Sequence, residues 1–202
     1  MFLTEPPTDD RVRARYDADR QHNGYVDNLT RLWCWRPDAL EAYEHARDLV
    51  LHECGLSDRD IALLVTATAA ARSDSYCALA WGSRLAARSD LETAASVLAG
   101  SAAGLDDRAS ALTQWARRVA TDPNSTTPAD VERLREVGLT DRQIFDATVF
   151  VTLRMAFSTV NDALGAHPDV QLAQAVPARI RAAVNFGRPP AQVPSTYDAG
   201  DP

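Results

Sequence analysis

The residues best suited to chemistry lie in the segment SDSYCALAWGSRL, residues 73 to 85. Asp74, Cys77 and Trp81 are three and four positions apart, and in a helix such positions share one face. A carboxylate, a thiol and an indole would therefore form one column. This pattern fits a thiol active site, the remains of one, or a helix packed in the core.

Each member of this column also has a structural interpretation. Asp74 stands where a helix is expected to begin, and aspartate there commonly accepts hydrogen bonds from backbone N–H groups two or three residues later. A free cysteine such as Cys77 is most often a small buried hydrophobe. Trp81 is equally compatible with ordinary core packing. The sequence leaves these interpretations open beside the chemical ones.

The remaining thiols and imidazoles form no recognisable site. Cys34, Cys54 and Cys77 contain no CxxC pair, and three thiols cannot pair completely, so we expect no disulfide framework. His45 and His52 could share a helix face, but no carboxylate or thiol completes a metal site with them. We therefore predict neither a metal nor another cofactor.

Composition excludes several classes of function. A net charge of −7 with no basic cluster disfavours a nucleic-acid partner. All 21 basic residues are arginine, and the lack of lysine rules out Schiff-base chemistry, a phosphate-loop lysine and a pyridoxal phosphate linkage. No apolar run reaches the roughly 18 residues that span a bilayer. The first residues, MFLTEPPTDDRVRARYD, also lack an apolar signal core, so we expect a cytoplasmic protein.

The elements that position the column are predicted to be helices. Sustained alternation and Asn-Gly turns are missing, which indicates an all-α fold. Residues 1–28 are expected to form an N-terminal arm or irregular lead-in, and residues 29–185 a helical domain. Residues 186–202, rich in proline, are expected to form a tail that is loose or draped over a neighbour. Helices are predicted from Pro37 to near Gly55, from Ser57, from Ser73 or Asp74 to about Ala87, and over 91–100, 106–121, 128–137, 140–165 and the segment VPARIRAAVNFG.

Two helix starts resemble each other. LSDRDI at residue 56 and LTDRQI at residue 139 share Leu-Ser/Thr-Asp-Arg-x-Ile, and each precedes a long apolar helix. Ser57 with Asp60 forms a variant of the capping box, in which two side chains satisfy exposed N–H groups. The echo suggests two related helical units about a pseudo-symmetric core, although chance similarity of two capping sequences would also explain it.

The chain resembles the carboxymuconolactone decarboxylase and alkylhydroperoxidase D-like superfamily, particularly its peroxidase-related branch. The likeness is carried by GYVDNLTRLWCWRPDALEAY, LSDRDIALLVTATAAARSDSYCALAWGSRLA and VNDALGAHPD, within about residues 24 to 170. It implies an all-helical protein that assembles as a homo-oligomer, a trimer or hexamer. It also implies a pocket between helices for a small-molecule substrate.

The resemblance also implies that most redox groups are missing. Redox members carry a glutamate, then a CxxC pair, then a histidine; these positions correspond here to Ala62, Asp74, Cys77 and Trp81. Where relatives often have Asn-Arg, this chain has Ser158-Thr159-Val160. A CxxC peroxidase needs a second thiol to resolve the sulfenic acid, and a neighbouring aspartate raises a thiol pKa. Disulfide-cycling peroxidase activity is therefore disfavoured.

We predict a divergent enzyme that performs non-redox chemistry on an apolar small molecule: proton transfer, decarboxylation, cyclisation or rearrangement. Asp74 and Cys77 are the candidate catalytic residues, with Asp74 as the acid or base. Trp81, Ala62, Tyr25 and Trp33 are the candidate substrate-binding residues. Two alternatives remain, namely a non-catalytic ligand-binding or assembly protein, and a one-cysteine thiol peroxidase that uses Cys77.

Overall fold

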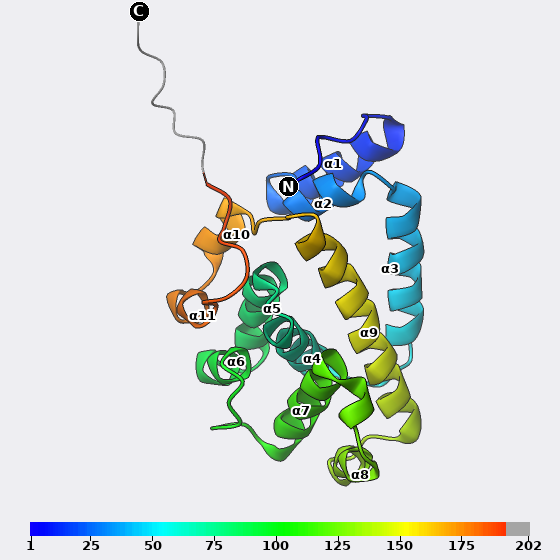
Figure 1. Ribbon diagram of the computed structural model, residues 1–202, viewed down its shortest axis with the longest axis vertical. Helices are drawn as coiled ribbons and strands as arrows, with labels where there is room; N and C mark the ends of the chain where they lie inside the picture. The colour runs from blue at the N-terminus through cyan, green and yellow to red at the C-terminus, as the bar shows by residue number, and fades with distance from the viewer. Residues whose placement is uncertain (193–202) are drawn as a thin grey trace, which may run out of the picture.

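The computed structural model describes residues 1–192, and residues 193–202 lie outside the described part. Within residues 1–192 every regular element is a helix, which confirms the expected all-α fold (Figure 1). The elements in chain order are α1 (Asp10–Asn23), α2 (Asn28–Trp33), α3 (Pro37–Leu51), α4 (Asp58–Ala71), α5 (Ser75–Arg88), α6 (Leu91–Leu98), α7 (Asp107–Thr121), the 3-10 turn η1 (Pro123–Ser125), α8 (Pro128–Glu136), α9 (Asp141–Ala163), α10 (Val170–Ala175) and α11 (Ala178–Ala183).

Helix α4 is the centre of the core. Its residues from Ala62 to Ala69 are all buried, and it packs against α5, α6, α7 and α9. A helix that is apolar on nearly all sides must be covered on all sides, as its sequence indicates. No helix in the described part of the chain is both long and apolar enough to cross a bilayer.

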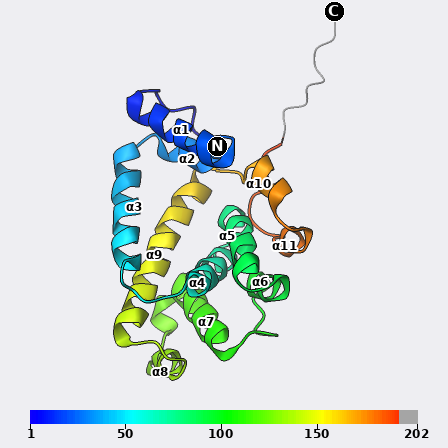
Figure 2. The ribbon, with the colours of Figure 1, turned by 180° about the vertical axis from the view of Figure 1, so that it is seen from behind.

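Helices α3 and α9 lie side by side, and both views agree on this (Figures 1 and 2). Helices α1 and α2 cover one end of the pair. An ion pair between Arg15 on α1 and Glu44 on α3, at 2.6 Å, ties the first helix to the third. On the other side of the molecule, α10 and α11 pack against α5 and α6. The long helix α9 thereby faces both α3 and the core.

The two echoed helix starts both form capping boxes. Ser57 accepts from the backbone N–H of Asp60 at 3.1 Å, and Asp60 accepts from that of Ser57 at 3.0 Å. Thr140 and Gln143 make the same reciprocal pair at 3.2 and 3.0 Å. The shared capping is confirmed, and the pseudo-symmetry of two units stays a prediction.

The N-terminal arm, in which no helix was predicted, is helical in its middle part. Residues 10–23 form α1, which Asp9 caps by accepting from the N–H of Val12 at 2.8 Å. Only Val12 and Tyr16 of this helix are buried. Two buried residues in four turns leave a weak apolar pattern, which explains why the sequence did not indicate a helix. Helix α2 ends in Trp33 and was not expected either.

The first residues after α11 are held against the core. The hydroxyl of Ser75 donates to the carbonyl of Arg188 at 2.6 Å, and the N–H of Ala191 donates to the carbonyl of Pro168 at 2.8 Å. Gly187 has φ +70°, and a Cβ there would lie 2.4 Å from the carbonyl of Ser73. Residues 186–192 of the predicted tail are therefore anchored by hydrogen bonds, whereas 193–202 lie outside the described residues.

Candidate active site

Asp74 caps α5 and is completely buried. Its Oδ1 accepts from the backbone N–H of Cys77 at 2.9 Å, as the capping interpretation predicts. Its Oδ2 accepts from the hydroxyl of Ser158 on α9 at 2.5 Å. Both carboxylate oxygens therefore have donors inside the protein, and the carboxylate ties the start of α5 to α9.

The thiol of Cys77 faces α9. Nη2 of Arg154 lies 3.1 Å from the Cys77 sulfur, and the Ser158 hydroxyl lies 3.9 Å from it. Cys77 and Arg154 are 3% and 7% exposed. A guanidinium at this distance is a donor that favours the thiolate form. The sequence column had given Cys77 no cationic neighbour, so this contact is new.

Despite Arg154, the thiol of Cys77 is a weak acid. Burial and, to a lesser degree, the charge of Asp74 raise its pKa, and Arg154 opposes both without overcoming them, so that the pKa is about 12. A pKa of about 12 leaves roughly one thiol in 10⁵ ionised at pH 7. Cys77 is thus a neutral thiol at physiological pH.

Cys77 lies in the wall of a cavity of about 410 Å³ between α1, α2, α3, α5 and α9. This volume lies within the usual range for small-molecule sites. The missed helix α1 contributes one side of it. The lining residues are Arg15, Ala18, Asp19, His22, Asn23, Asp27, Leu29, Thr30, Trp33, Leu40, Tyr43, Glu44, Arg47, Tyr76, Cys77, Ala80, Trp81, Arg84, Arg154 and Phe157.

Stacked aromatic rings form one part of this wall. Phe157 stacks on Trp33 and on Tyr43, with ring centroids 5.2 and 5.1 Å apart. The indole N–H of Trp33 donates to Oδ1 of buried Asn161 at 2.8 Å, which fixes the stack to α9. Such offset-parallel rings offer a flat apolar surface. The cavity therefore suits a flat, small ligand.

Carboxyl groups line another part of the wall. Asp27, the residue before α2, accepts from the side-chain amide of Asn23 at 3.0 Å, and its own N–H donates to Asp19 at 3.0 Å. Burial, together with the charges of Asp19 and Asp169, raises the pKa of Asp27 to about 7. A cavity carboxyl that is about half protonated at neutral pH is suited to proton transfer.

The structure separates the predicted site residues into two groups. Cys77, Trp81 and Trp33 line the cavity, whereas Ala62, Tyr25 and Asp74 are not among the lining residues. Ala62 is fully buried in the core around α4. Tyr25 is half-buried, and burial together with Asp169 and Asp27 raises its pKa to about 12. The substrate-binding roles of Ala62 and Tyr25 stay predictions.

Four residues of the cavity wall were not predicted from the sequence, namely Asp27, Tyr43, Arg154 and Phe157. The hydrogen bond from Ser158 to Asp74 was not predicted either. One signal was available: Arg154 interrupts the apolar sequence of α9. An arginine on a buried face is rare unless it has partners or a function. Among residues 1–192, no group of three or more His, Cys, Asp and Glu side chains is arranged to hold a metal ion.

Solved structures resemble this chain, although no family model and no curated protein matches its sequence. The alkylhydroperoxidase AhpD core of an uncharacterized peroxidase-related protein from Ralstonia eutropha JMP134 matches with a TM-score of 0.75 and 25% identity, over 85% of this chain and 93% of that one. An uncharacterized peroxidase-related protein from Silicibacter sp. TM1040 matches with 0.74 and 22%, over 85% and 93%. The chain has the alkylhydroperoxidase D-like fold.

A more distant likeness extends over nearly the whole chain. A cysteine-to-alanine variant of the debrominase Bmp8, in complex with 2,3,4-tribromopyrrole, matches with a TM-score of 0.65 and 12% identity, over 90% of this chain and 95% of that one. At this identity the likeness concerns the fold alone. The expected resemblance to the alkylhydroperoxidase D-like superfamily is confirmed, and the protein is a divergent example of that fold.

Proposed function

We propose that this protein is an enzyme that transfers a proton on a small apolar carbonyl compound, without a cofactor. One observation carries the proposal: the aromatic cavity presents a carboxyl, Asp27, that has no ion-pair partner among the described residues. The same wall holds one neutral thiol, Cys77. A cavity carboxyl whose pKa is raised to about 7 is suited to remove or return a proton next to a carbonyl group.

The acid or base role that the sequence assigned to Asp74 passes in this proposal to Asp27. Asp74 is completely buried, and both of its oxygens accept hydrogen bonds from Cys77 and Ser158. A substrate in the cavity meets Cys77 before it could meet Asp74. Asp74 thus acts as a positioning residue that fixes the thiol and raises its pKa, which keeps the thiol neutral.

Proton transfer is favoured over thiol redox chemistry for two reasons. The high pKa of Cys77 leaves little thiolate to attack a peroxide. Within the described residues, Cys77 is also the one cysteine in the cavity wall, so a sulfenic acid formed there has no resolving thiol beside it. The fold itself is compatible with small ring compounds, since the Bmp8 variant holds a tribromopyrrole.

The test is exchange of acidic C–H protons into D2O. A panel of aryl ketones, α-keto acids and butenolides is incubated with the protein and followed by proton NMR. We expect exchange with wild type, a loss of at least 100-fold in Asp27→Asn, and a smaller loss in Cys77→Ser. Asp107→Asn, at the exposed start of α7, is the matched control and should behave as wild type. Exchange that is equal in wild type and Asp27→Asn would contradict the proposal.

A second candidate rests on the 3.1 Å contact between Arg154 and Cys77. A guanidinium there would stabilise a thiolate once formed, so a one-cysteine peroxidase reduced by an external thiol is the competing function. Peroxide consumption with a dithiol reductant, compared between wild type and Cys77→Ser, separates the two. Cys77-dependent consumption supports the peroxidase. Ligand binding with neither exchange nor consumption supports a binding protein.

A further inference from the structure

Arg154 is a buried cation whose hydrogen bonds are incomplete. A guanidinium has five N–H donors. Nη2 donates to the sulfur of Cys77 at 3.1 Å, and Nη1 reaches the hydroxyl of Tyr43 only at 3.5 Å. Nε is buried and has no acceptor in the described part of the chain. A buried charged group left partly unsatisfied is costly, which indicates that something else accepts from it.

No carboxylate of the described chain forms an ion pair with Arg154. The charge of Asp74 is near enough to affect its pKa, but both Asp74 oxygens already accept from Cys77 and Ser158. Two other arginines of the cavity wall are paired: Arg15 with Glu44 at 2.6 Å and Arg47 with Asp48 at 2.8 Å. Arg154 thus differs from them by its burial and by its lack of an anion.

The surroundings fix the guanidinium in one place. It lies over the faces of Phe157 and Trp81, with 5.1 and 5.7 Å from its carbon to the ring centroids. Arg84 lies over Trp81 at 4.6 Å and has no ion-pair partner among the described residues. Two guanidinium groups therefore lie near one indole. A guanidinium placed over a ring can still donate to acceptors in its own plane.

We propose that the cavity binds a small aromatic carboxylate, whose carboxylate group accepts hydrogen bonds from Arg154 while its ring packs on the stack of Trp33, Tyr43 and Phe157. Planar carboxylates match the fork of a guanidinium, and such pairs gain strength when water is excluded. This proposal rests on the proposed function, because it names the substrate class of the same cavity. It adds that the apolar ring of the substrate carries an anionic carboxylate, whereas the sequence indicated only an apolar molecule.

The experiment compares two probes that differ mainly in charge, trans-cinnamate and trans-cinnamamide. Dissociation constants are measured by calorimetry for the full-length protein. We expect wild type to bind cinnamate at least ten-fold more tightly than cinnamamide. In Arg154→Met the preference should fall to within two-fold. Arg154→Lys keeps the charge but not the planar fork, so it should recover only part of the preference.

The matched control is Arg142→Met, which removes an exposed arginine from the same helix, α9. It should keep the wild-type preference, which excludes a general effect of net charge. Acetate, which has the carboxylate without the ring, should bind at least 100-fold more weakly than cinnamate. Equal binding of cinnamate and cinnamamide to wild type, or a preference unchanged in Arg154→Met, would overturn the proposal.

A second measurement uses the wild-type protein alone, so the proposal can still be tested if Arg154→Met does not fold. Cinnamate bound at Arg154 should protect the neighbouring Cys77 from iodoacetamide at least five-fold more than the same concentration of cinnamamide. Equal protection by cinnamate and cinnamamide would contradict the proposed contact between the ligand carboxylate and Arg154. Failure of this proposal is distinguishable from failure of the proposed function: Asp27-dependent proton exchange on neutral aryl ketones persists if only the carboxylate anchor is wrong.

Discussion

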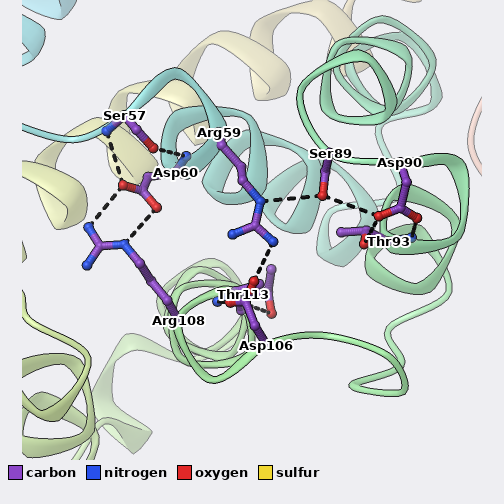
Figure 3. Close-up of polar contacts among 10 residues, drawn as sticks. Ser57, Arg59, Asp60, Ser89, Asp90, Thr93, Asp106, Arg108 and Thr113 are labelled. Atoms are coloured by element: carbon purple, nitrogen blue, oxygen red, sulfur yellow. Dashed lines mark hydrogen bonds and ion pairs between the residues drawn. The ribbon is translucent and has the colours of Figure 1, made fainter.

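Two buried aspartates near helix starts, Asp60 and Asp74, have an arginine from another helix close by, yet their surroundings differ. Arg108 on α7 donates to both Asp60 oxygens at 3.0 Å (Figure 3). The third nitrogen of Arg108 donates to the carbonyl of Val137 at 2.8 Å. Arg154 on α9 turns instead to Cys77, and its Nε stays without an acceptor in the described chain. Each nitrogen of Arg108 thus has an acceptor within the protein, whereas Arg154 lacks an acceptor for Nε and lines a cavity.

The pKa directions follow this difference. Burial works to raise the pKa of Asp60, but the hydrogen bonds from Arg108 and Ser57 outweigh it and lower the pKa overall. At Cys77, burial and Asp74 outweigh Arg154 and raise the pKa. A fully paired network strengthens the fold, whereas a partly paired one is expected where a ligand completes it. The predictions below test this contrast.

The largest effect is expected from breaking the complete network. Arg108→Gln leaves the carboxylate of Asp60, which is 3% exposed, without its bidentate partner. Loss of one partner of a buried pair costs about 3 kcal/mol in the free energy of unfolding. Urea denaturation at pH 7 measures it. Arg59→Gln, which removes the more exposed pair with Asp106 shown in Figure 3, is the control and should cost less than about 1 kcal/mol.

The low pKa of Asp60 also sets a pH dependence. A carboxyl whose folded pKa lies below its ordinary value stabilises the protein above that ordinary value and loses this contribution as pH falls through the folded pKa. The difference in stability between wild type and Arg108→Gln should therefore shrink as the pH is lowered below 4. A difference that stays constant over this range would show that the two side chains are not coupled through charge.

The second effect concerns the acidity of the cavity thiol. Asparagine at position 74 keeps an oxygen for the N–H of Cys77 but removes the charge that raises the thiol pKa. We expect iodoacetamide to label Cys77 several-fold faster in Asp74→Asn at pH 8, as measured by peptide mass spectrometry. Arg154→Met should shift the rate in the opposite direction. Cys34, whose pKa burial raises to about 11, serves as the internal control. A slower Cys77 reaction in Asp74→Asn would contradict the assigned electrostatics.

The third effect is a pH-dependent gain in stability from Asp27→Asn. The folded protein holds the Asp27 proton with a pKa of about 7, above the ordinary value of 3.8. Ionising this carboxyl therefore costs stability as pH rises from about 4 through 7. Because it is only half-buried and water screens it, we expect a gain of about 1 kcal/mol at pH 8 and a smaller gain at pH 5. A pH-independent change in the unfolding free energy would argue against a raised pKa.

The sequence predicts local features of this molecule well and distant pairings poorly. Helix starts such as Ser57 and Asp74 depend on residues three positions away, and the structure confirms both caps. The contact of Arg154 with Cys77 joins residues 77 positions apart, and no local pattern encodes it. Helix α1 was missed because few of its residues are buried, and with it one side of the cavity.

The smallest change in the free energy of unfolding is expected in Arg154→Met, the variant that contrasts most directly with Arg108→Gln. The side chain is 7% exposed, as buried as many core residues, but it carries a charge that no carboxylate of the described chain pairs. Replacing such a charge by an apolar side chain of similar length removes a desolvation cost and loses contacts with Cys77 and two aromatic rings. We expect the removed desolvation cost and the lost contacts to offset each other, so that the unfolding free energy without ligand changes by less than about 1 kcal/mol. Urea denaturation with and without cinnamate measures both states, and cinnamate should stabilise wild type but not the variant. A loss as large as that of Arg108→Gln would mean that Arg154 is structural, and the contrast between the two networks would disappear.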